Sequence, residues 1–141
     1  MEHVLSCPTG GFPTLRHNQV RDFTANIMSE VCHDVSLETP LQELSDELLH
    51  HATSIRDDRA RLDIWAIGFW GDRSRRSFFD VRVFNPNAPS NWKLKLNSAY
   101  RRHEKEKQRS YEQRIREVEH GSFTPLVFSA SGGMGELAAT A

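Results

Sequence analysis

Two acidic and two basic side chains in this sequence have types and spacings that suit phosphate chemistry at a divalent metal ion. Asp63 and Asp80 lie in apolar surroundings, Arg82 follows Asp80 by two residues, and Lys107 lies in a long polar segment. Paired carboxylates provide the oxygen ligands that Mg²⁺ or Mn²⁺ prefers, and such an ion activates water and neutralises phosphate charge. A nearby ammonium or guanidinium can stabilise the charge that develops in the transition state.

Two predicted β-strands carry the acids. Residues 60–69 and 76–84 are rich in β-branched and aromatic side chains, and a turn-prone segment with Gly-Asp at its centre separates them. In an antiparallel pair joined by this turn, residues whose numbers sum to about 143 face each other. This register brings Asp63 opposite Asp80.

Opposed carboxylates repel each other, so a fold that keeps Asp63 opposite Asp80 needs a cation or a proton between them. A shared Mg²⁺ is one solution. The alternative is a slipped register or a longer loop, with each acid facing an arginine such as Arg61 or Arg82. Both interpretations fit the sequence.

The second of these strands has two different faces. Successive side chains of a strand point to opposite sides, so Phe79, Val81 and Val83 form an apolar face. Asp80 and Arg82 project from the other face. We therefore expect this strand in the middle of a sheet, with its charged face at the site.

A long helix is predicted from about Leu96 to His120, with Gly121 as its C-cap. Its apolar stripe consists of Leu96, Tyr100, Tyr111, Ile115 and Val118. At 100° per residue, Lys107 falls near the middle of this stripe and Glu104 near one side, so both point inward. Lys107 then either bridges to Glu104 or reaches an acidic site. The other charges of the helix are typical of a solvated face.

The remaining predicted elements complete one domain. The Gly- and Pro-rich segment up to Asn18 is predicted to be a loop, and apolar residues at helical spacing predict a helix over residues 19–32. Those apolar residues are Val20, Phe23, Ile27 and Val31. Further predicted elements are a short or edge strand before Pro40, a helical turn and charged loop at 45–59, a strand at 122–130, and a glycine loop leading into a helix at 131–141.

Composition limits the function classes. The chain has 141 residues, of which 38% are hydrophobic and 26% charged, which suits one domain. It has no membrane-length apolar run and no secretory signal, so we expect a nuclear or cytoplasmic location and no membrane partner. Cys7 and Cys32 do not suggest a disulfide framework. With a net charge of -1, any nucleic-acid binding must come from local patches.

The predicted order of helix, three strands, long helix and strand indicates an α/β fold with a mixed sheet of about four strands flanked by helices. With Asp63 on the second strand and Asp80-x-Arg82 on the third, this order resembles the PD-(D/E)XK restriction-like nuclease core. The resemblance implies that Asp63 and Asp80 bind Mg²⁺ or Mn²⁺ where a phosphodiester is cleaved. Arg82 stands where the family has lysine; it can stabilise charge but is a poor proton-transfer group. Lys107 could take the lysine's role, as in some members of the family.

A second resemblance covers nearly the whole chain. The chain is similar to the region downstream of the reverse transcriptase in LINE-type (non-LTR) retrotransposon polyproteins, where a zinc-knuckle-like segment precedes a restriction-like endonuclease. The segments that carry the similarity are HVLSCPTGGFPTLRHNQVRD, EVCHDV, RLDIWAIGFW, FFDVRVFNPNAPSN, YRRHEKEKQRSYEQR and FTPLVFSASGGMG. The resemblance implies DNA as substrate, nicking that primes reverse transcription, and the reverse transcriptase domain of the parent element as partner.

The same resemblance divides the chain into two regions. Residues 1–17 would be a remnant of the knuckle, and residues 18–141 the endonuclease domain with an incomplete C-terminal helix, so that both ends look truncated. Of the zinc ligands, His3, Cys7 and His17 remain. A structural zinc site takes four ligands, so zinc binding is doubtful.

Two other classes remain open. The chain could be an inert DNA-binding or assembly module of the same element, or a relic without a maintained function. The DNA-binding module predicts a contiguous basic surface and affinity that depends on salt, without turnover. Its expected residues are Arg73, Arg75, Arg76, Arg101 and Arg102.

Overall fold

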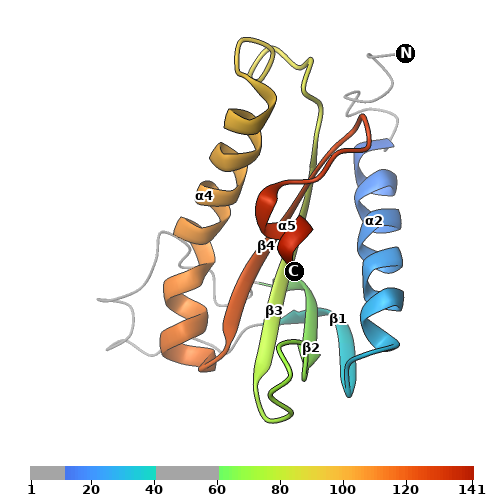
Figure 1. Cartoon of the computed structure of the whole chain (residues 1–141), viewed down its shortest axis with the longest axis vertical. Helices are drawn as coiled ribbons and strands as arrows, with labels where there is room; N and C mark the ends of the chain where they lie inside the picture. The colour runs from blue at the N-terminus through green and yellow to red at the C-terminus, as the bar shows by residue number, and fades with distance from the viewer. Residues whose placement is uncertain (1–11, 41–60) are drawn as a thin grey trace.

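The computed structural model describes residues 12–40 and 61–141. These residues form an α/β fold in which helices α2 and α4 lie on opposite sides of a four-stranded sheet (Figure 1). The elements are α2 (Phe12–Ser29), β1 (Asp34–Pro40), β2 (Arg61–Ile67), β3 (Arg76–Phe84), α4 (Leu96–Arg114), the π-helix η1 (Ile115–Glu119), β4 (Ser122–Ser129) and α5 (Glu136–Thr140). The predicted order of helices and strands is confirmed. The helical turn predicted at 45–59 lies outside the described residues.

The sheet is mixed, as predicted. Its strand order is β1-β2-β3-β4; β1 and β2 pair antiparallel, β2 and β3 pair antiparallel, and β3 and β4 pair parallel. Parallel neighbours need a crossover connection, and α4 with η1 provides it. Strand β1 is at an edge, as the proline at its end suggested. No helix in the described residues is both long enough and apolar enough to span a membrane.

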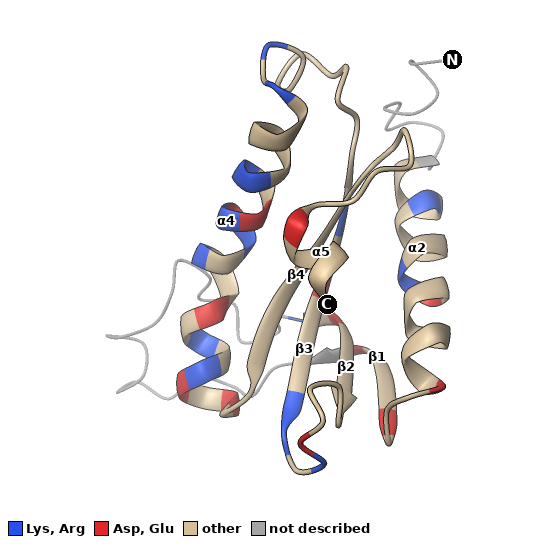
Figure 2. Ribbon diagram, viewed as in Figure 1, with Lys and Arg blue, Asp and Glu red and all other residues tan. Residues whose placement is uncertain are grey.

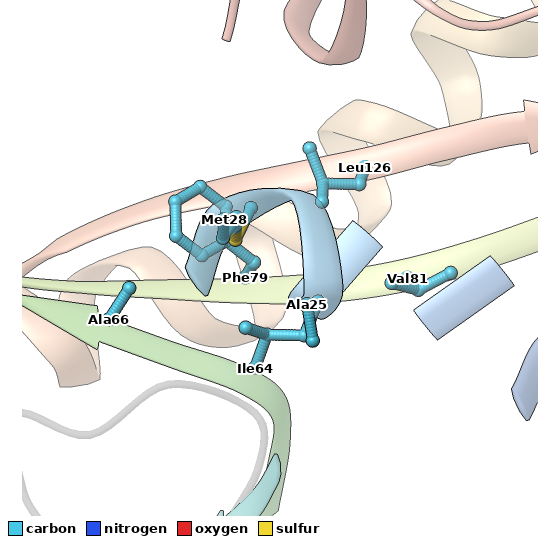
Figure 3. Close-up of a cluster of buried hydrophobic side chains, with 7 residues drawn as sticks. All are labelled: Ala25, Met28, Ile64, Ala66, Phe79, Val81 and Leu126. Atoms are coloured by element: carbon cyan, nitrogen blue, oxygen red, sulfur yellow. The ribbon is translucent and has the colours of Figure 1, made fainter. Parts of the chain in front are cut away.

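Strand β3 is buried on both faces, in the way its alternation predicted. Phe79 and Val81 pack with Ala25 and Met28 of α2 in an apolar cluster that also includes residues of β2 and β4 (Figure 3). On the other face, Phe78 packs near η1, and Phe84 packs against Ala99 and Tyr100 of α4. Asp80 and Arg82 therefore lie between two apolar patches on the α4 side.

Helix α2 begins at Phe12, so the predicted loop up to Asn18 is wrong in its last part. Proline is tolerated in the first turn of a helix, where its missing N–H would have no intrahelical partner, and Pro13 lies there. The boundary expected between residues 17 and 18 thus falls inside α2. The predicted buried stripe is also wrong: Phe23, Ile27 and Val31 are exposed. The residues of α2 that pack on the sheet are instead Ala25 and Met28, with Arg21 buried beside them.

The long helix begins at Leu96 as predicted but ends differently. Its last turn is the π-helix η1, and His120, not Gly121, adopts the left-handed conformation that closes it (φ 53°). Gly121 serves close packing, because a Cβ there would lie 2.8 Å from the carbonyl oxygen of Arg76 and 2.9 Å from the Phe78 ring. In the predicted stripe, Ile115 is fully buried and Leu96 is exposed.

Candidate active site between strand β3 and helix α4

The two predicted acids lie on neighbouring strands in the predicted register. Ile64 pairs with Phe79 across β2 and β3, so the next pair of positions along the hairpin is Asp63 and Asp80. Their charges interact, since the Asp63 carboxylate acts to raise the pKa of Asp80. The register predicted from a turn centred on Gly-Asp is confirmed for Ile64–Ile67, and the pairing ends there, one residue before Asp63 and Asp80.

The alternation of side chains between the two faces of β2 is interrupted at Asp63. Leu62 packs with Phe78 and Ile115 on the α4 side, whereas Ile64 packs with α2 on the opposite side. Residues two apart in a regular strand share a face, so the backbone twists between them. The neighbouring strand is also irregular here, because Glu38 of β1 has a positive φ of 51°. The twist lets the Asp63 side chain reach the free edge of β3.

The main chain of Val81, on that free edge, is held by two side chains. The Val81 N–H donates a hydrogen bond of 2.7 Å to Asp63 Oδ2. His17 Nε2, from α2, donates one of 3.0 Å to the Val81 carbonyl oxygen and lies 3.2 Å from Asp63 Oδ2. Buried main-chain polar groups need partners, and these contacts supply them beyond the last β2–β3 pair of the described residues. We call His17, Asp63 and the Val81 main chain the clasp.

The clasp shifts the protonation of both of its side chains. The hydrogen bond with Asp63 raises the pKa of His17, against the opposing effect of burial. Burial favours the neutral form of Asp63, but the hydrogen bonds from His17 and Val81 outweigh it and lower the pKa of this carboxyl. The arrangement therefore favours an imidazolium next to a carboxylate.

Asp80 is paired with Lys107. The Lys107 Nζ lies 2.6 Å from Asp80 Oδ2, and the Asp80 side chain is only 8% exposed. Burial raises the pKa of Asp80, the Lys107 ammonium opposes this rise, and Asp63 adds to it. The prediction that Lys107 points inward toward an acid is confirmed in its geometry. Glu104 is not the partner; its carboxylate accepts a hydrogen bond from the Leu137 N–H.

Arg82 lies on the same face as Asp80 but contacts a different acid. Its Nη1 is 3.7 Å from Glu106 Oε1, and about a third of its side chain is exposed. Within residues 12–40 and 61–141, the ion-pair partners of Asp63 and Asp80 are His17 and Lys107. The alternative that each acid faces Arg61 or Arg82 is thus wrong for the described residues.

The two acids carry carboxylate oxygens, which are the atoms that a hard divalent cation binds. Asp80 Oδ2 is buried and accepts no hydrogen bond of good geometry from the described residues, although the ammonium is within ion-pair distance. No cluster of three or more His, Cys, Asp or Glu side chains in this part of the chain forms a ready-made cage. Mg²⁺ usually keeps several waters and binds through one or two carboxylates plus substrate phosphates, so two acids suffice for it.

Of the three expected zinc ligands, only His17 lies among the residues that the structure describes. His3 and Cys7 lie outside the described residues, and His17 belongs to α2, where its ring faces Asp63 and Val81. His17 is therefore part of the acid site. Its role as a partner of Asp63 was not predicted, because a loop was expected at this position and His17 was named only as a zinc ligand.

A hollow of about 640 Å³ lies elsewhere, on the α2 side of the sheet. It is lined mostly by apolar residues, among them Phe23, Ile27, Val83 and Phe128, and it has no acidic side chain. This hollow therefore lacks the groups that phosphate chemistry needs.

The basic surface expected for an inert DNA-binding module is not contiguous. Arg73, Arg75 and Arg76 lie in or next to the β2–β3 turn, and the Arg76 side chain contacts Glu119 at the end of η1. Arg101 and Arg102 lie near the other end of α4 (Figure 1). Comparison of the sequence with known protein families and with curated proteins found no match.

Proposed function

We propose that this chain is a metal-dependent DNA endonuclease with a restriction-like core, derived from a retrotransposon, which nicks one strand to prime reverse transcription. The observation that carries the proposal is the 2.6 Å contact between Lys107 Nζ and Asp80 Oδ2, with Asp63 near enough for its carboxylate to act on the pKa of Asp80. Two carboxylates can hold a divalent ion that activates water, and a nearby ammonium can stabilise charge on a phosphate. The coarse fold, a mixed four-stranded sheet between helices, agrees with such a core.

In this proposal Asp63 and Asp80 hold Mg²⁺ or Mn²⁺ through carboxylate oxygens. The bound ion supplies an activated water and neutralises charge on the scissile phosphate. Asp63 enters the site as an anion, because the hydrogen bonds of the clasp lower its pKa. The clasp also fixes the direction of its carboxylate, since Oδ2 is held by the Val81 N–H and by His17.

Lys107 and Arg82 have different tasks in this scheme. The Lys107 ammonium, which is already at the buried acid, orients the attacking water and stabilises negative charge on the phosphate. Arg82 is more exposed and contacts Glu106, so it is placed to meet a phosphate that arrives from solvent. Binding of the substrate would exchange the Glu106 contact for a phosphate contact.

The test is nicking of supercoiled plasmid by the purified chain with Mg²⁺ or Mn²⁺, and with EDTA as the blank. We expect nicking that needs metal and that falls by more than about 100-fold in Asp63→Asn and Asp80→Asn, because even outer-shell partners of a metal are worth 10–100-fold. Asp34→Asn is the matched control, since Asp34 is exposed at the start of β1. Folded wild-type protein that does not nick, or that nicks equally well as Asp80→Asn, would refute the proposal.

A further inference from the structure

The exposed charges of α4 and of the loop before it are mainly positive. Some charged side chains of this segment are buried or paired. Glu104 is buried, Lys107 is paired with Asp80, and Glu106 lies near Arg82. The exposed cations between residues 93 and 114 are Lys93, Lys95, Arg101, Arg102, Lys105 and Arg109, and the exposed carboxylates are Glu106 and Glu112. Figure 2 shows basic residues recurring along α4. The sequence predicted a solvated face with mixed charges, and within residues 93–114 the exposed charges are six cations and two carboxylates.

Four of these cations share one side of the helix. At 100° per residue, Arg101, Arg102, Lys105 and Arg109 fall within an arc of roughly 100°, and Lys107 is on about the opposite side. Within the described part of the chain, Arg101, Lys105 and Arg109 form no ion pair. We call these four residues the outer basic face. It points away from the sheet and from Asp63 and Asp80, and the exposed Glu112 falls within the same arc beyond Arg109.

We propose that the outer basic face of α4 binds the phosphate backbone of nucleic acid, at a surface separate from the candidate active site. Each step of four residues advances the face by roughly 6 Å along the helix, so its cations form a row that can follow a backbone with one charge per 3.4 Å of each strand. Arg101 and Arg109 carry a planar fork that matches a phosphate in bidentate fashion, whereas the fork of Arg102 holds the preceding loop. The net charge of the chain is -1, so this row is a local feature.

An exposed aromatic ring next to the row favours nucleic acid over an acidic protein. Trp92 is 61% exposed, and the Lys93 ammonium lies 5.3 Å from its ring centroid. Arg102 donates hydrogen bonds to the Ser90 carbonyl oxygen and to Asn91 Oδ1, which fixes this loop at the end of the row. An indole at the end of a row of cations offers a stacking surface for an unpaired base, and an acidic peptide has no such base.

The proposal is tested by fluorescence anisotropy with labelled duplex and single-stranded DNA in EDTA, where no metal-dependent cleavage can occur. The test variant is Lys105→Glu with Arg109→Glu. The control is Arg73→Glu with Arg75→Glu, which changes the net charge equally at exposed positions of the β2–β3 turn. We expect at least a tenfold loss of affinity in the test variant and less than a threefold loss in the control. The slope of log affinity against log salt should fall by about 2 in the test variant only.

Other outcomes decide the partner class. Trp92→Ala should lower the affinity for single-stranded DNA more than the affinity for duplex DNA. Equal binding of polyglutamate of matched charge, or of vesicles with anionic lipid, would overturn the nucleic-acid assignment. Equal losses in the test and control variants would overturn the location. Circular dichroism and thermal melting confirm that each variant is folded. The proposal does not depend on cleavage: Asp80→Asn should bind like wild type, so binding without nicking would refute only the endonuclease proposal.

Discussion

The two acids of the candidate site are held from opposite sides of the sheet, and their pKa values are shifted in opposite directions. Asp63 lies where the alternation of β2 is interrupted, is partly exposed, and is held by His17 of α2 and the Val81 N–H. Asp80 lies in the middle of β3, is almost fully buried, and has Lys107 of α4 as its ion-pair partner. The pKa of Asp63 is lowered and that of Asp80 is raised. Environments that push the pKa values of two carboxyl groups apart give them different roles: Asp63 favours the anionic form, whereas burial disfavours the anion of Asp80 and the Lys107 ammonium favours it.

The largest expected loss of folding stability comes from removing Lys107, the partner of the more buried acid. Lys107→Met leaves Asp80 buried and unpaired, and breaking such a pair by removing one partner costs about 3–5 kcal/mol. Because 22% of the Lys107 side chain is exposed, we expect a loss near the lower end of this range in urea unfolding at pH 8. Lys105→Met, on the exposed side of the same helix, should change stability by less than about 0.5 kcal/mol.

The double variant Asp80→Asn with Lys107→Met sharpens this prediction. Replacing both partners removes the unpaired charge, so the double variant should be more stable than Lys107→Met alone. A double variant that is as unstable as the single one would mean that Lys107 acts through packing on its neighbours and not through Asp80.

The pH dependence of Lys107→Met has a definite sign. A carboxyl group whose folded pKa is raised contributes stability that is fully present below its unfolded pKa of about 3.9 and is lost as pH rises through the folded pKa. Removing the ammonium raises the pKa of Asp80 further. The stability that Lys107→Met loses relative to wild type should therefore become smaller as pH is lowered from 8 to 5. A deficit that does not change with pH would contradict the assigned ion pair.

A smaller loss of folding stability is expected when the partner of Asp63 on α2 is removed. His17→Asn removes the partner of Asp63, and a hydrogen bond to a charged group contributes about 1.5–3 kcal/mol when buried, so about 1 kcal/mol is expected at this partly exposed site. The pKa of His17 is raised, so its stabilisation is fully present below the unfolded value of about 6.5 and is lost as pH rises through the folded value. The difference between wild type and His17→Asn should thus be large at pH 6 and small at pH 9. His33→Asn, at an exposed position, serves as control.

The smallest expected effect is the difference between the pKa values of two histidines, which NMR titration measures. His103 is buried beside Phe84, and burial, with Arg82 and Arg102, lowers its pKa to about 4. His17 should titrate above the ordinary value of 6.5 and His103 far below it. The stabilising effect of neutral His103 is lost as pH falls from about 6.5 toward 4, which is opposite in sign to the effect of His17. If both rings titrated at the same pH, the expected difference in histidine pKa between the α2 side and the α4 side of the sheet would be refuted.

Features set by short-range pattern were predictable from the sequence. The Gly-Asp turn fixed the β2–β3 register, strand alternation placed Asp80 and Arg82 on one face, and the helical period directed Lys107 inward. The clasp was not predictable in this way. His17 and Asp63 are 46 residues apart, and proline and glycine concealed the first turns of α2. The alternation of Leu62 and Ile64 looks regular in sequence, so the twist at Asp63 leaves no local signal.

The buried side of α2 was missed for a different reason. The most apolar residues of this helix, Phe23 and Ile27, are exposed, and the small Ala25 faces the sheet. Arg21 is buried because its guanidinium pairs with Asp22 and Glu38. Charge pairing with a neighbouring strand can thus decide which face of a helix is inside, and a hydrophobic pattern does not record it.

The parallel pairing of β3 with β4 also bears on how the molecule folds. Every residue of this pair meets a partner 45 positions away in the sequence, from Ser77 with Ser122 to Phe84 with Ser129. Closing such a long loop costs entropy before the contacts repay it, and it slows folding compared with the local β2–β3 hairpin. Helix α4 lies within this loop, so the local β2–β3 hairpin can pair before Lys107 arrives. Asp63 and Asp80 then lack the ammonium that favours their anions, and we expect a divalent cation or a lower pH to speed refolding.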